Sequence, residues 1–392
     1  MFTIQMLNQI AACGLANFPK DQYTIEKENE HPDGVLVRSY NMKDMNISPN
    51  VKAIARAGAG VNNIPVEACT EKGIVVFNTP GANANAVKEL VLASLLLSSR
   101  NLLDGIQWTK SLQGEGDQIP QLVESGKKNY VGSEIRGKKL GIIGLGAIGA
   151  LVANDALALD MEVVGYDPYV SVETAWRLSR QVQRAINIEE IFSTCDYITM
   201  HVPLVEQTKG MLDAEAFRMM KKGVRILNFS RGELVNEADL QAALEDEIVS
   251  AYITDFPNEN VIGMKNVIAI PHLGASTYES EENCAIMAAK QLRTYLETGN
   301  IKNSVNYPDV ELPYFGKKRL TVAHKNVPNM VGQMTAFLAE HGINIADMIN
   351  RSKGVYAYTI IDIDNGVDAN IKEEIVNKIR NISGVAAARI IQ

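Results

Sequence analysis

Three side chains whose types could together support hydride and proton transfer follow short β-rich runs. They are Arg231 after RILNFS, Glu259 in TDFPNEN, and His272 after VIAIP. Reduction of a 2-oxo acid needs a cation for the carboxylate and carbonyl oxygen, and a proton donor for the oxygen that becomes an alkoxide. Arg231 suits the first task and His272 the second, while a carboxylate such as Glu259 would orient the imidazole. Taken singly, each has a duller explanation as a turn cap, a solvated acid or a satisfied polar residue.

A glycine-rich turn follows one of these runs at the right place for a dinucleotide. The segment KKLGIIGLGAIG puts an apolar strand directly before Gly144, Gly146 and Gly149. A tight turn, a close backbone approach to pyrophosphate and helix-to-strand packing each require a residue without a side chain. The next run, EVVGYD, ends at Asp167, where a carboxylate would accept hydrogen bonds from a ribose 2'-hydroxyl. This acid predicts NAD rather than NADP. The alternative for the whole segment is a glycine-rich helix cap that binds no ligand.

The elements that must position these residues alternate between β-rich runs and amphipathic segments over most of the first 300 residues. Such alternation predicts an α/β fold with parallel sheets covered by helices, and the continuous apolar runs are typical of strands buried on both faces. Beyond a proline-containing linker, the order strand, helix, strand, strand, helix, strand predicts a ferredoxin-like βαββαβ domain.

Length and composition limit the functional classes. A chain of 392 residues is long enough for two or three domains, and a net charge of −8 argues against nucleic acid or an anionic membrane as the main partner. No apolar run is long enough to span a bilayer. The four cysteines are far apart and lack metal-site spacing, so they predict reduced thiols in a cytoplasmic protein without a bound metal.

Five stretches resemble the D-isomer-specific 2-hydroxyacid dehydrogenases along nearly the whole chain: ARAGAGVNNIPV, NTPGANANAVKELV, GKKLGIIGLGAIG, FSRGELVNEADL and PHLGAST. The resemblance, which is to members with a C-terminal ACT domain, implies two Rossmann-like lobes. The implied limits are a discontinuous substrate-binding domain at residues 1–96 and 278–307, an NAD-binding domain at 97–277, a linker at 308–316 and an ACT regulatory domain at 317–392.

The family's residue roles are carried over by motif. Arg231 would bind the substrate carboxylate and carbonyl, and Glu259 would support His272 as the acid/base. The implied cofactor contacts are Gly144, Gly146, Ala147, Ile148, Gly149, Asp167, His201, Pro203, Ser230, Asp255, Gly274 and Ala275. The implied substrate contacts are Arg38, Ser39, Ala59, Gly60, Val61 and Asn83. The chain departs from the family at Thr254-Asp255, so either residue is a candidate for the nicotinamide contact.

The implied reaction is NAD-dependent oxidation of 3-phospho-D-glycerate to 3-phosphooxypyruvate, the first step of L-serine synthesis, with 2-oxoglutarate reduction as a side activity. One alternative is a dehydrogenase of another D-2-hydroxy acid, such as lactate or glycerate. Another is an NAD(H)-sensing interaction protein resembling the C-terminal binding corepressors, in which an ACT domain would be foreign.

The same resemblance implies a homodimer or homotetramer. It also implies an L-serine site at His324, Asn326 and Asn344 between paired ACT domains. Asn329, which stands where a glycine is usual, speaks against serine inhibition because its side chain adds bulk where the ligand approaches.

Overall fold

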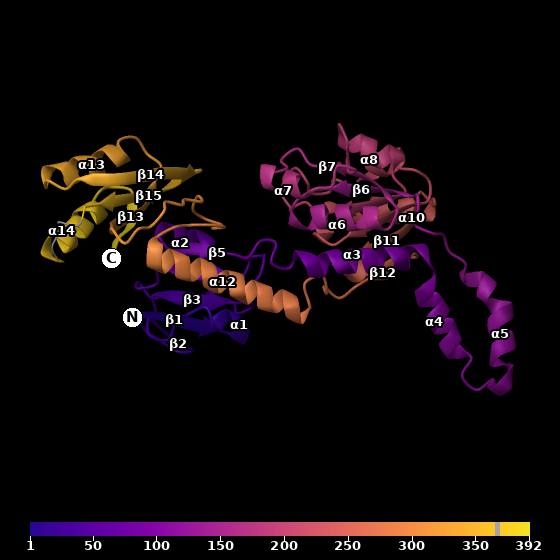
Figure 1. The fold of residues 1–392 in the computed structure, drawn as a ribbon. Coiled ribbons are helices and arrows are strands. Elements are labelled where there is room, and N and C mark those ends of the chain that lie inside the picture. The colour runs from indigo at the N-terminus through magenta and orange to yellow at the C-terminus, as the bar shows by residue number, and fades with distance from the viewer. Residues whose placement is uncertain (365–368) are drawn as a thin grey trace. The chain divides into compact units, whose positions relative to one another are not determined.

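The computed structural model describes residues 1–364 and 369–392, which form two compact units (Figure 1). The first unit holds residues 1–83 and 278–392, and the second holds residues 84–277. Each unit contains a parallel sheet, and a separate antiparallel sheet ends the chain, as the sequence predicts. The sequence-based domain limit between residues 96 and 97 falls inside helix α3 (Ala84–Ser99), which lies in the second unit.

The first unit is built on a five-stranded parallel sheet in the order β2-β1-β3-β4-β5. The strands are β1 (Phe2–Leu7), β2 (Tyr23–Glu26), β3 (Gly34–Val37), β4 (Ala53–Arg56) and β5 (Val75–Phe77). The helices beside it are α1 (Ala12–Leu15), α2 (Val66–Glu71) and α12 (Tyr278–Thr298). Alanines of α12 and Leu292 share one apolar core with Ile4 and Leu36. Small residues let this long helix approach the strands closely, because a Cβ at Gly34 would lie only 3.0 Å from Leu292.

The second unit contains a seven-stranded parallel sheet in the order β12-β11-β10-β9-β6-β7-β8. Its strands are β6 (Lys139–Ile143), β7 (Glu162–Tyr166), β8 (Gln183–Arg184), β9 (Tyr197–Met200), β10 (Val224–Asn228), β11 (Val249–Thr254) and β12 (Val267–Ala269). The strand order reverses at β6, and open α/β sheets bind their ligands outside the carboxyl ends of the strands at such a point.

Helices cover both faces of this sheet, so its central strands β6, β7, β9, β10 and β11 are largely buried on both sides as predicted, whereas the edge strand β8 is exposed. Alternate strand residues, such as Ile142 and Ile143, enter two different apolar cores. The helices of the second unit, apart from the segment described next, are α3, α6 (Ala147–Ala158), α7 (Val172–Arg177), α8 (Ile188–Thr194), α9 (Ala214–Met219), α10 (Glu237–Glu245) and α11 (Glu259–Ile262), with a 3-10 turn η3 (Gly232–Leu234).

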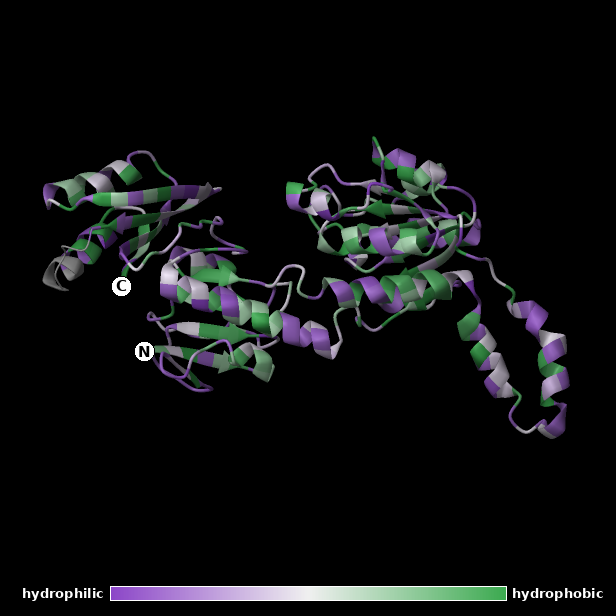
Figure 2. Ribbon diagram, in the orientation of Figure 1, coloured by the Kyte–Doolittle hydropathy of each residue, from purple (hydrophilic) through white to green (hydrophobic). Residues whose placement is uncertain are grey.

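Residues 102–130 form a helical arm that the sequence analysis did not predict. It consists of α4 (Leu102–Ser111), η1 (Gly116–Gln118), α5 (Ile119–Gly126) and η2 (Lys127–Tyr130). Figure 2 shows apolar residues on both helices of the arm, and Leu102, Leu103 and Ile106 are exposed. Trp108 stacks on Tyr130 with ring centroids 5.2 Å apart and joins the two sides of the arm. No helix in the described part of the chain has the length and apolar character needed to cross a lipid bilayer.

The C-terminal segment has the predicted βαββαβ order around a four-stranded antiparallel sheet, β14-β15-β13-β16. Its elements are β13 (Lys318–Lys325), α13 (Met330–Glu340), β14 (Ile345–Lys353), β15 (Tyr356–Ile363), α14 (Ala369–Arg380) and β16 (Val385–Ile391). One face of the sheet, including Leu320 and Val322, packs with residues of both helices. The opposite face, including Ala323 and Tyr358, shares the apolar core of the first unit.

A buried arginine, Arg319, forms an ion pair within this sheet and also joins the sheet to the end of α12 and the linker. Arg319 is fully buried and donates from Nε and Nη2 to the carboxylate of Asp362, at 2.6 and 2.8 Å. Its Nη1 also donates to the carbonyl oxygens of Thr298 and Leu312, and Nη2 donates to the Pro313 carbonyl. The bidentate geometry and the additional acceptors satisfy a charge that would otherwise be costly to bury.

Replacing only one member of this pair should therefore destabilise the first unit. We expect Arg319→Met to lower the free energy of unfolding by about 3 kcal/mol, because it leaves the Asp362 carboxylate buried without its cation. The double variant Arg319→Met/Asp362→Leu should recover much of this loss. Urea unfolding of the full chain measures both effects, and Lys222→Met, in an exposed ion pair with Glu247, is the matched control. Equal losses in the single and double variants would contradict this account.

Candidate active site

The glycine-rich turn has the geometry that a dinucleotide requires. Gly144 has φ +92°, and a Cβ there would lie 2.8 Å from the backbone of His201. A Cβ at Gly149 would lie 2.0 Å from the carbonyl oxygen of Gly144, so only glycine allows α6 to pack against this turn. Gly146 faces open space, with no atom within 4 Å of an added Cβ. Two glycines therefore shape the turn, and the third leaves room for a ligand beside Ala147 and Ile148, the first residues of α6.

Asp167 follows β7 and stabilises the same turn. Its carboxylate accepts hydrogen bonds from the backbone N–H groups of Leu145 at 2.9 Å and Tyr169 at 2.8 Å. A carboxylate can accept about four hydrogen bonds, so acceptor capacity is left for the hydroxyls of a ribose. The position and the remaining capacity suit the adenosine half of NAD.

The predicted contacts after β9 and β10 are tied to neighbouring strand ends. The backbone N–H of His201 donates to Ile143 at 2.7 Å, beside the glycine turn. Burial lowers the pKa of His201 to about 4, so its ring is neutral at neutral pH. Its Nε2 lies 3.0 Å from the Thr199 hydroxyl. Ser230 donates from Oγ to the carbonyl of Met200 at 2.7 Å, which ties the turn after β10 to the end of β9. Pro203 is exposed just beyond His201.

Arg231 is exposed and is held by its backbone. Buried Asn228 donates from Nδ2 to the Arg231 carbonyl at 2.7 Å and accepts the Ser230 N–H at its side-chain oxygen at 3.2 Å. The same Nδ2 donates to the Tyr252 hydroxyl. Asn228 thus shapes the turn that presents the guanidinium, a role that the sequence analysis missed. Its signal was a polar residue at the end of an otherwise apolar run.

Phe256 brings Arg231 and His272 to one place. The guanidinium carbon of Arg231 lies 5.8 Å from the centroid of the Phe256 ring, and the His272 ring centroid lies 4.9 Å from it. These residues follow β10, β11 and β12, which are neighbours in the sheet. A permanent cation and an imidazole therefore share one aromatic contact at the carboxyl edge, and these are the two groups that reduction of a 2-oxo acid needs. His272 has φ +53°, a conformation that is uncommon outside glycine and is found at functional sites.

The carboxylate of Asp255 holds the loop that carries His272. It is 2% exposed and accepts the backbone N–H groups of Leu273 and Gly274, each at 2.7 Å. Burial raises the pKa of Asp255, while the two amides and His272 lower it. A Cβ at Gly274 would lie 2.9 Å from this carboxylate, so the glycine permits the close approach. Ala275 continues the loop, half-buried.

The structure assigns different surroundings to the two residues that the sequence left as alternatives. Thr254 is fully buried at the end of β11, and its hydroxyl accepts the backbone N–H of Phe256 at 3.1 Å. Asp255 is the member of the pair that reaches the His272 loop.

Glu259 does not occupy the predicted position beside His272. It is exposed at the start of α11, and within residues 1–364 and 369–392 no hydrogen bond or ion pair joins the two side chains. The flanking residues Asn258 and Asn260 instead donate to the carboxylate of Glu237. Among the described residues there is also no group of His, Cys, Asp and Glu that could hold a metal ion.

The predicted substrate residues of the first unit lie after adjacent strands β3 and β4. Arg56 connects their loops, donating to the carbonyls of Arg38 at 2.9 Å and of Gly60. Asn78 donates to the Ala59 carbonyl. Val61 is half-buried, Ser39 is exposed, and Asn83 ends the unit's first segment. The guanidinium of Arg38 is paired with Glu281 of α12, so an anionic ligand would have to compete with that carboxylate.

The three residues of the predicted serine site do not meet within one chain. His324 and Asn326 lie where β13 pairs with the start of β15, whereas Asn344 precedes β14 at the opposite end of the sheet. His324 is buried, and its ring nitrogens lie 2.8 Å from the Thr359 hydroxyl and the Lys325 carbonyl. Burial lowers the pKa of His324. Asn329 has φ +62° before α13, so it adopts the conformation that a glycine would provide.

Comparisons with known proteins identify relatives of the chain. Residues 92–274 match the family described as the D-isomer specific 2-hydroxyacid dehydrogenase, NAD binding domain. A D-3-phosphoglycerate dehydrogenase of Haemophilus influenzae is 32% identical, covering 92% of this chain and 86% of its own. The Escherichia coli K12 enzyme of that name is 31% identical, and the match covers 98% of this chain and 94% of that enzyme. The Methanocaldococcus jannaschii enzyme is 33% identical, and the match spans 64% of its length.

A solved structure is also similar. The NAD+-bound 3-phosphoglycerate dehydrogenase of Entamoeba histolytica is 28% identical with a TM-score of 0.59, covering 78% of this chain and 98% of that one.

The close-packed Gly149 and the open Gly146 should respond differently to substitution by alanine. We expect Gly149→Ala to destabilise the second unit by about 1–3 kcal/mol, because its methyl group would meet the Gly144 carbonyl. Gly146→Ala should fold like the parent protein but bind NADH more weakly, since its methyl group would occupy the ligand's space. Thermal unfolding and NADH fluorescence titration measure the two effects. Unchanged NADH affinity in Gly146→Ala would contradict the assignment of this turn.

The Asp255 carboxylate should affect both stability and turnover. Asp255→Ala leaves the buried Gly274 amide and the partly buried Leu273 amide without an acceptor. We therefore expect a loss of about 2 kcal/mol in unfolding free energy and at least a tenfold fall in kcat. Asp196→Ala is the matched control, because Asp196 accepts the Lys139 N–H at the opposite, amino edge of the sheet. It should lower stability with little effect on kcat. Equal effects of both variants on kcat would show that Asp255 acts through stability alone.

Proposed function

The chain belongs to the D-isomer-specific 2-hydroxyacid dehydrogenases, and on that premise we propose that it oxidises 3-phospho-D-glycerate to 3-phosphooxypyruvate. It is an oxidoreductase with NAD as cofactor. The relatives named D-3-phosphoglycerate dehydrogenase, at 31–33% identity, support this substrate over lactate or glycerate. The proposed reaction would supply the carbon skeleton for L-serine, with 2-oxoglutarate reduction as a side activity.

The observation that carries the proposed chemistry is the shared contact of Arg231 and His272 with Phe256. An arginine fork binds a carboxylate and an adjacent oxygen through paired N–H donors. In the oxidation, the neutral His272 imidazole accepts the proton of the C2 hydroxyl while the C2 hydrogen leaves with its electron pair. Bound NAD supplies the acceptor for that hydride. In the reverse direction, the imidazolium returns the proton to the carbonyl oxygen, and Arg231 stabilises the charge that develops there.

Asp255 acts in this proposal as the positioning carboxylate. It fixes the backbone on the C-terminal side of His272 and lies close enough to interact electrostatically with the ring. Glu259 could assume its family role only after a movement of α11 toward the ring. We therefore propose Arg231 and His272 as catalytic residues, with the role of Glu259 dependent on such a change.

For the first unit we propose that the loop amides of Ala59, Gly60 and Val61 receive the substrate carboxylate. The substrate phosphate would replace the Glu281 carboxylate as the partner of the Arg38 guanidinium, and Ser39 and Asn83 would add polar contacts. This exchange is reasonable because the ion pair is about half exposed, at 45% and 42% of the two side chains, and exposed pairs contribute little stability.

We propose a substrate-binding domain at residues 1–83 and 278–307, an NAD-binding domain at 84–277, a linker at 308–316 and an ACT domain at 317–392. The first limit moves from 96/97 to 83/84 because the whole of α3 lies in the second unit. L-serine would bind only where two copies of the C-terminal sheet pair, because one chain separates Asn326 from Asn344. The exposed apolar residues of the arm support a homodimer through the second unit, and pairing of C-terminal sheets would extend it to a tetramer. The four free cysteines support a cytoplasmic location.

The assay that tests the function measures NADH oxidation with 3-phosphooxypyruvate, hydroxypyruvate, pyruvate and 2-oxoglutarate, each with and without L-serine. We expect the phosphorylated acid to give the highest kcat/KM. His272→Asn should lower kcat roughly a hundredfold or more, since general acid–base catalysis contributes about that much. Arg231→Gln should raise KM as well as lower kcat.

Exposed His31 provides the matched control, because His31→Asn should leave both constants unchanged. A higher kcat/KM for an unphosphorylated acid would contradict the proposed substrate but not the proposed hydride and proton transfer. If NADH bound while none of the four acids was reduced, the protein would instead be a nicotinamide-sensing interaction protein.

A further inference from the structure

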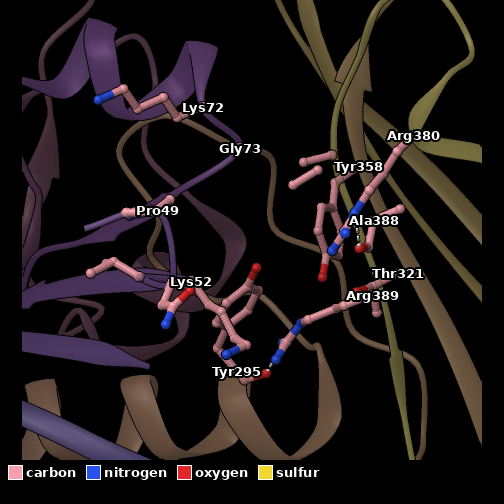
Figure 3. A pocket seen from close by; sticks show the side chains of 14 residues that line it. Pro49, Lys52, Lys72, Gly73, Tyr295, Thr321, Tyr358, Arg380, Ala388 and Arg389 are labelled. Carbon is pink, nitrogen blue, oxygen red and sulfur yellow. Dashed lines mark hydrogen bonds between the residues drawn. The ribbon is translucent and has the colours of Figure 1, made fainter. Parts of the chain in front are cut away.

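A cavity of about 210 Å3 lies inside the first unit, between the C-terminal sheet and the parallel-sheet domain. Figure 3 shows the side chains of Pro49 and Lys52 on one side, and those of Thr321, Tyr358 and Arg389 on the other. Tyr295 of α12 adds an aromatic ring to the wall. None of the residues that line this cavity is among those proposed for catalysis, NAD binding or serine binding.

The walls of this cavity are fixed by close packing. A Cβ at Gly73, which has φ +75°, would lie 2.4 Å from the Cβ of Ala387 in β16. Tyr358 donates its hydroxyl to the Gly299 carbonyl at 3.0 Å. Arg380 donates from Nε to the Ala388 carbonyl at 3.1 Å. The first two contacts join the C-terminal sheet to the parallel-sheet domain of the same unit, and the third fixes Arg380 against β16 within the C-terminal domain.

The charges around the cavity are positive. Its lining contains Lys52, Lys72, Arg380 and Arg389, and it contains no aspartate or glutamate. Lys52 is paired with Asp33, whereas no carboxylate pairs with the two arginines within the described chain. Figure 3 shows the Lys72 side chain extending away from the C-terminal sheet, so this lysine contributes charge at the rim of the cavity rather than a direct contact with a ligand.

Arg389 in particular has an unused donor. Its Nη1 and Nη2 donate to the carbonyls of Leu296 and Tyr295, at 3.2 and 2.5 Å, and its guanidinium lies 4.3 Å from the Tyr295 ring centroid. Its Nε is buried and has no hydrogen-bond partner among the described residues. Buried donors in native structures are nearly always paired with protein, water or a ligand. The guanidinium is thus held in place while its buried Nε–H remains without an acceptor.

We propose that this cavity, between the C-terminal sheet and the parallel-sheet domain, binds a small multivalent anion with carboxylate or phosphoryl groups. Arg380 and Arg389 would supply charge-assisted hydrogen bonds to the anion from the C-terminal sheet domain. Lys52 would add positive charge from the parallel-sheet side of the cavity. The size supports a small metabolite, because one water needs roughly 10–15 Å3 and pockets for larger ligands measure about 300–1,000 Å3. Since the walls come from both parts of the unit, the anion would stabilise the docking of the C-terminal sheet.

The test uses the full chain, with citrate and inorganic phosphate as probes in isothermal titration at constant ionic strength. The parent protein should bind at least one of them and unfold at a higher temperature in its presence. Arg380→Glu should weaken binding at least tenfold, because it replaces a charge-assisted donor by a repelling carboxylate. Asn50→Asp, on the parallel-sheet side of the lining, should weaken binding in the same direction and checks the site independently of the C-terminal sheet.

Two controls separate this site from other anion sites. Arg351→Glu changes an exposed arginine of β14 that does not line the cavity and should bind like the parent protein. Arg231→Gln should also retain binding, whereas an anion bound through Arg231 would be lost with it. The proposal is overturned if neither probe binds the parent protein, or if Arg380→Glu and Asn50→Asp both bind as the parent does. None of these outcomes depends on which acid the enzyme oxidises.

Discussion

The hydrogen bonds from two consecutive backbone amides to the buried Asp255 carboxylate determine the geometry of the candidate active site. Leu273 and Gly274 lie directly after His272, so their attachment to β11 fixes the path of the chain beyond the imidazole. The left-handed conformation of His272 can persist because the surrounding bonds over-determine it. A carboxylate inside the protein is costly unless it is paired, and the two amides supply that pairing. The same interaction thus satisfies a buried charge and positions the proton carrier.

The parallel sheet explains why residues distant in sequence meet here. Strands β10, β11 and β12 are hydrogen-bonded neighbours, and each ends at the same edge with one functional side chain beyond it. Asn228 links the first two, because its side chain bonds the Arg231 turn while its carbonyl accepts the Asp255 N–H at 3.2 Å. Phe256 then fills the space between the arginine and the histidine. The site is therefore a consequence of strand order together with one buried amide and one aromatic ring.

Local patterns in the sequence predicted the parts of the site that depend on local backbone geometry. The roles of Gly144 and Gly149 follow from a turn that admits no side chain, and Asp167 follows from its position at the end of the next strand. Glu259 could not be placed in this way, because its direction depends on where α11 begins and on the bonds from Asn258 and Asn260 to Glu237. The different surroundings of Thr254 and Asp255 could not be predicted either, because they depend on the register of Thr254 with Asn228 and Ala269. Asn228 was marked only by its polarity at the end of an apolar run, because its bonds to the Ser230 and Arg231 backbone depend on how the turn closes. Phe256 acts through tertiary contacts with Arg231 and His272, so spacing gave no sign of it.

The C-terminal sheet attaches to the first unit by a different principle. Its helix-covered face is apolar, but its opposite face carries Arg319, Thr321 and Arg389 among apolar residues. Arg319 is satisfied entirely within the protein, by Asp362 and several carbonyls, and can act as a permanent connection. Arg389 is only partly satisfied and lies at a cavity with no acid in its lining. A dry apolar interface would hold the sheet in place regardless of solutes, whereas this combination makes its docking depend on what fills the cavity. One arginine fixes where the sheet attaches, and the other makes the strength of that attachment responsive to anions.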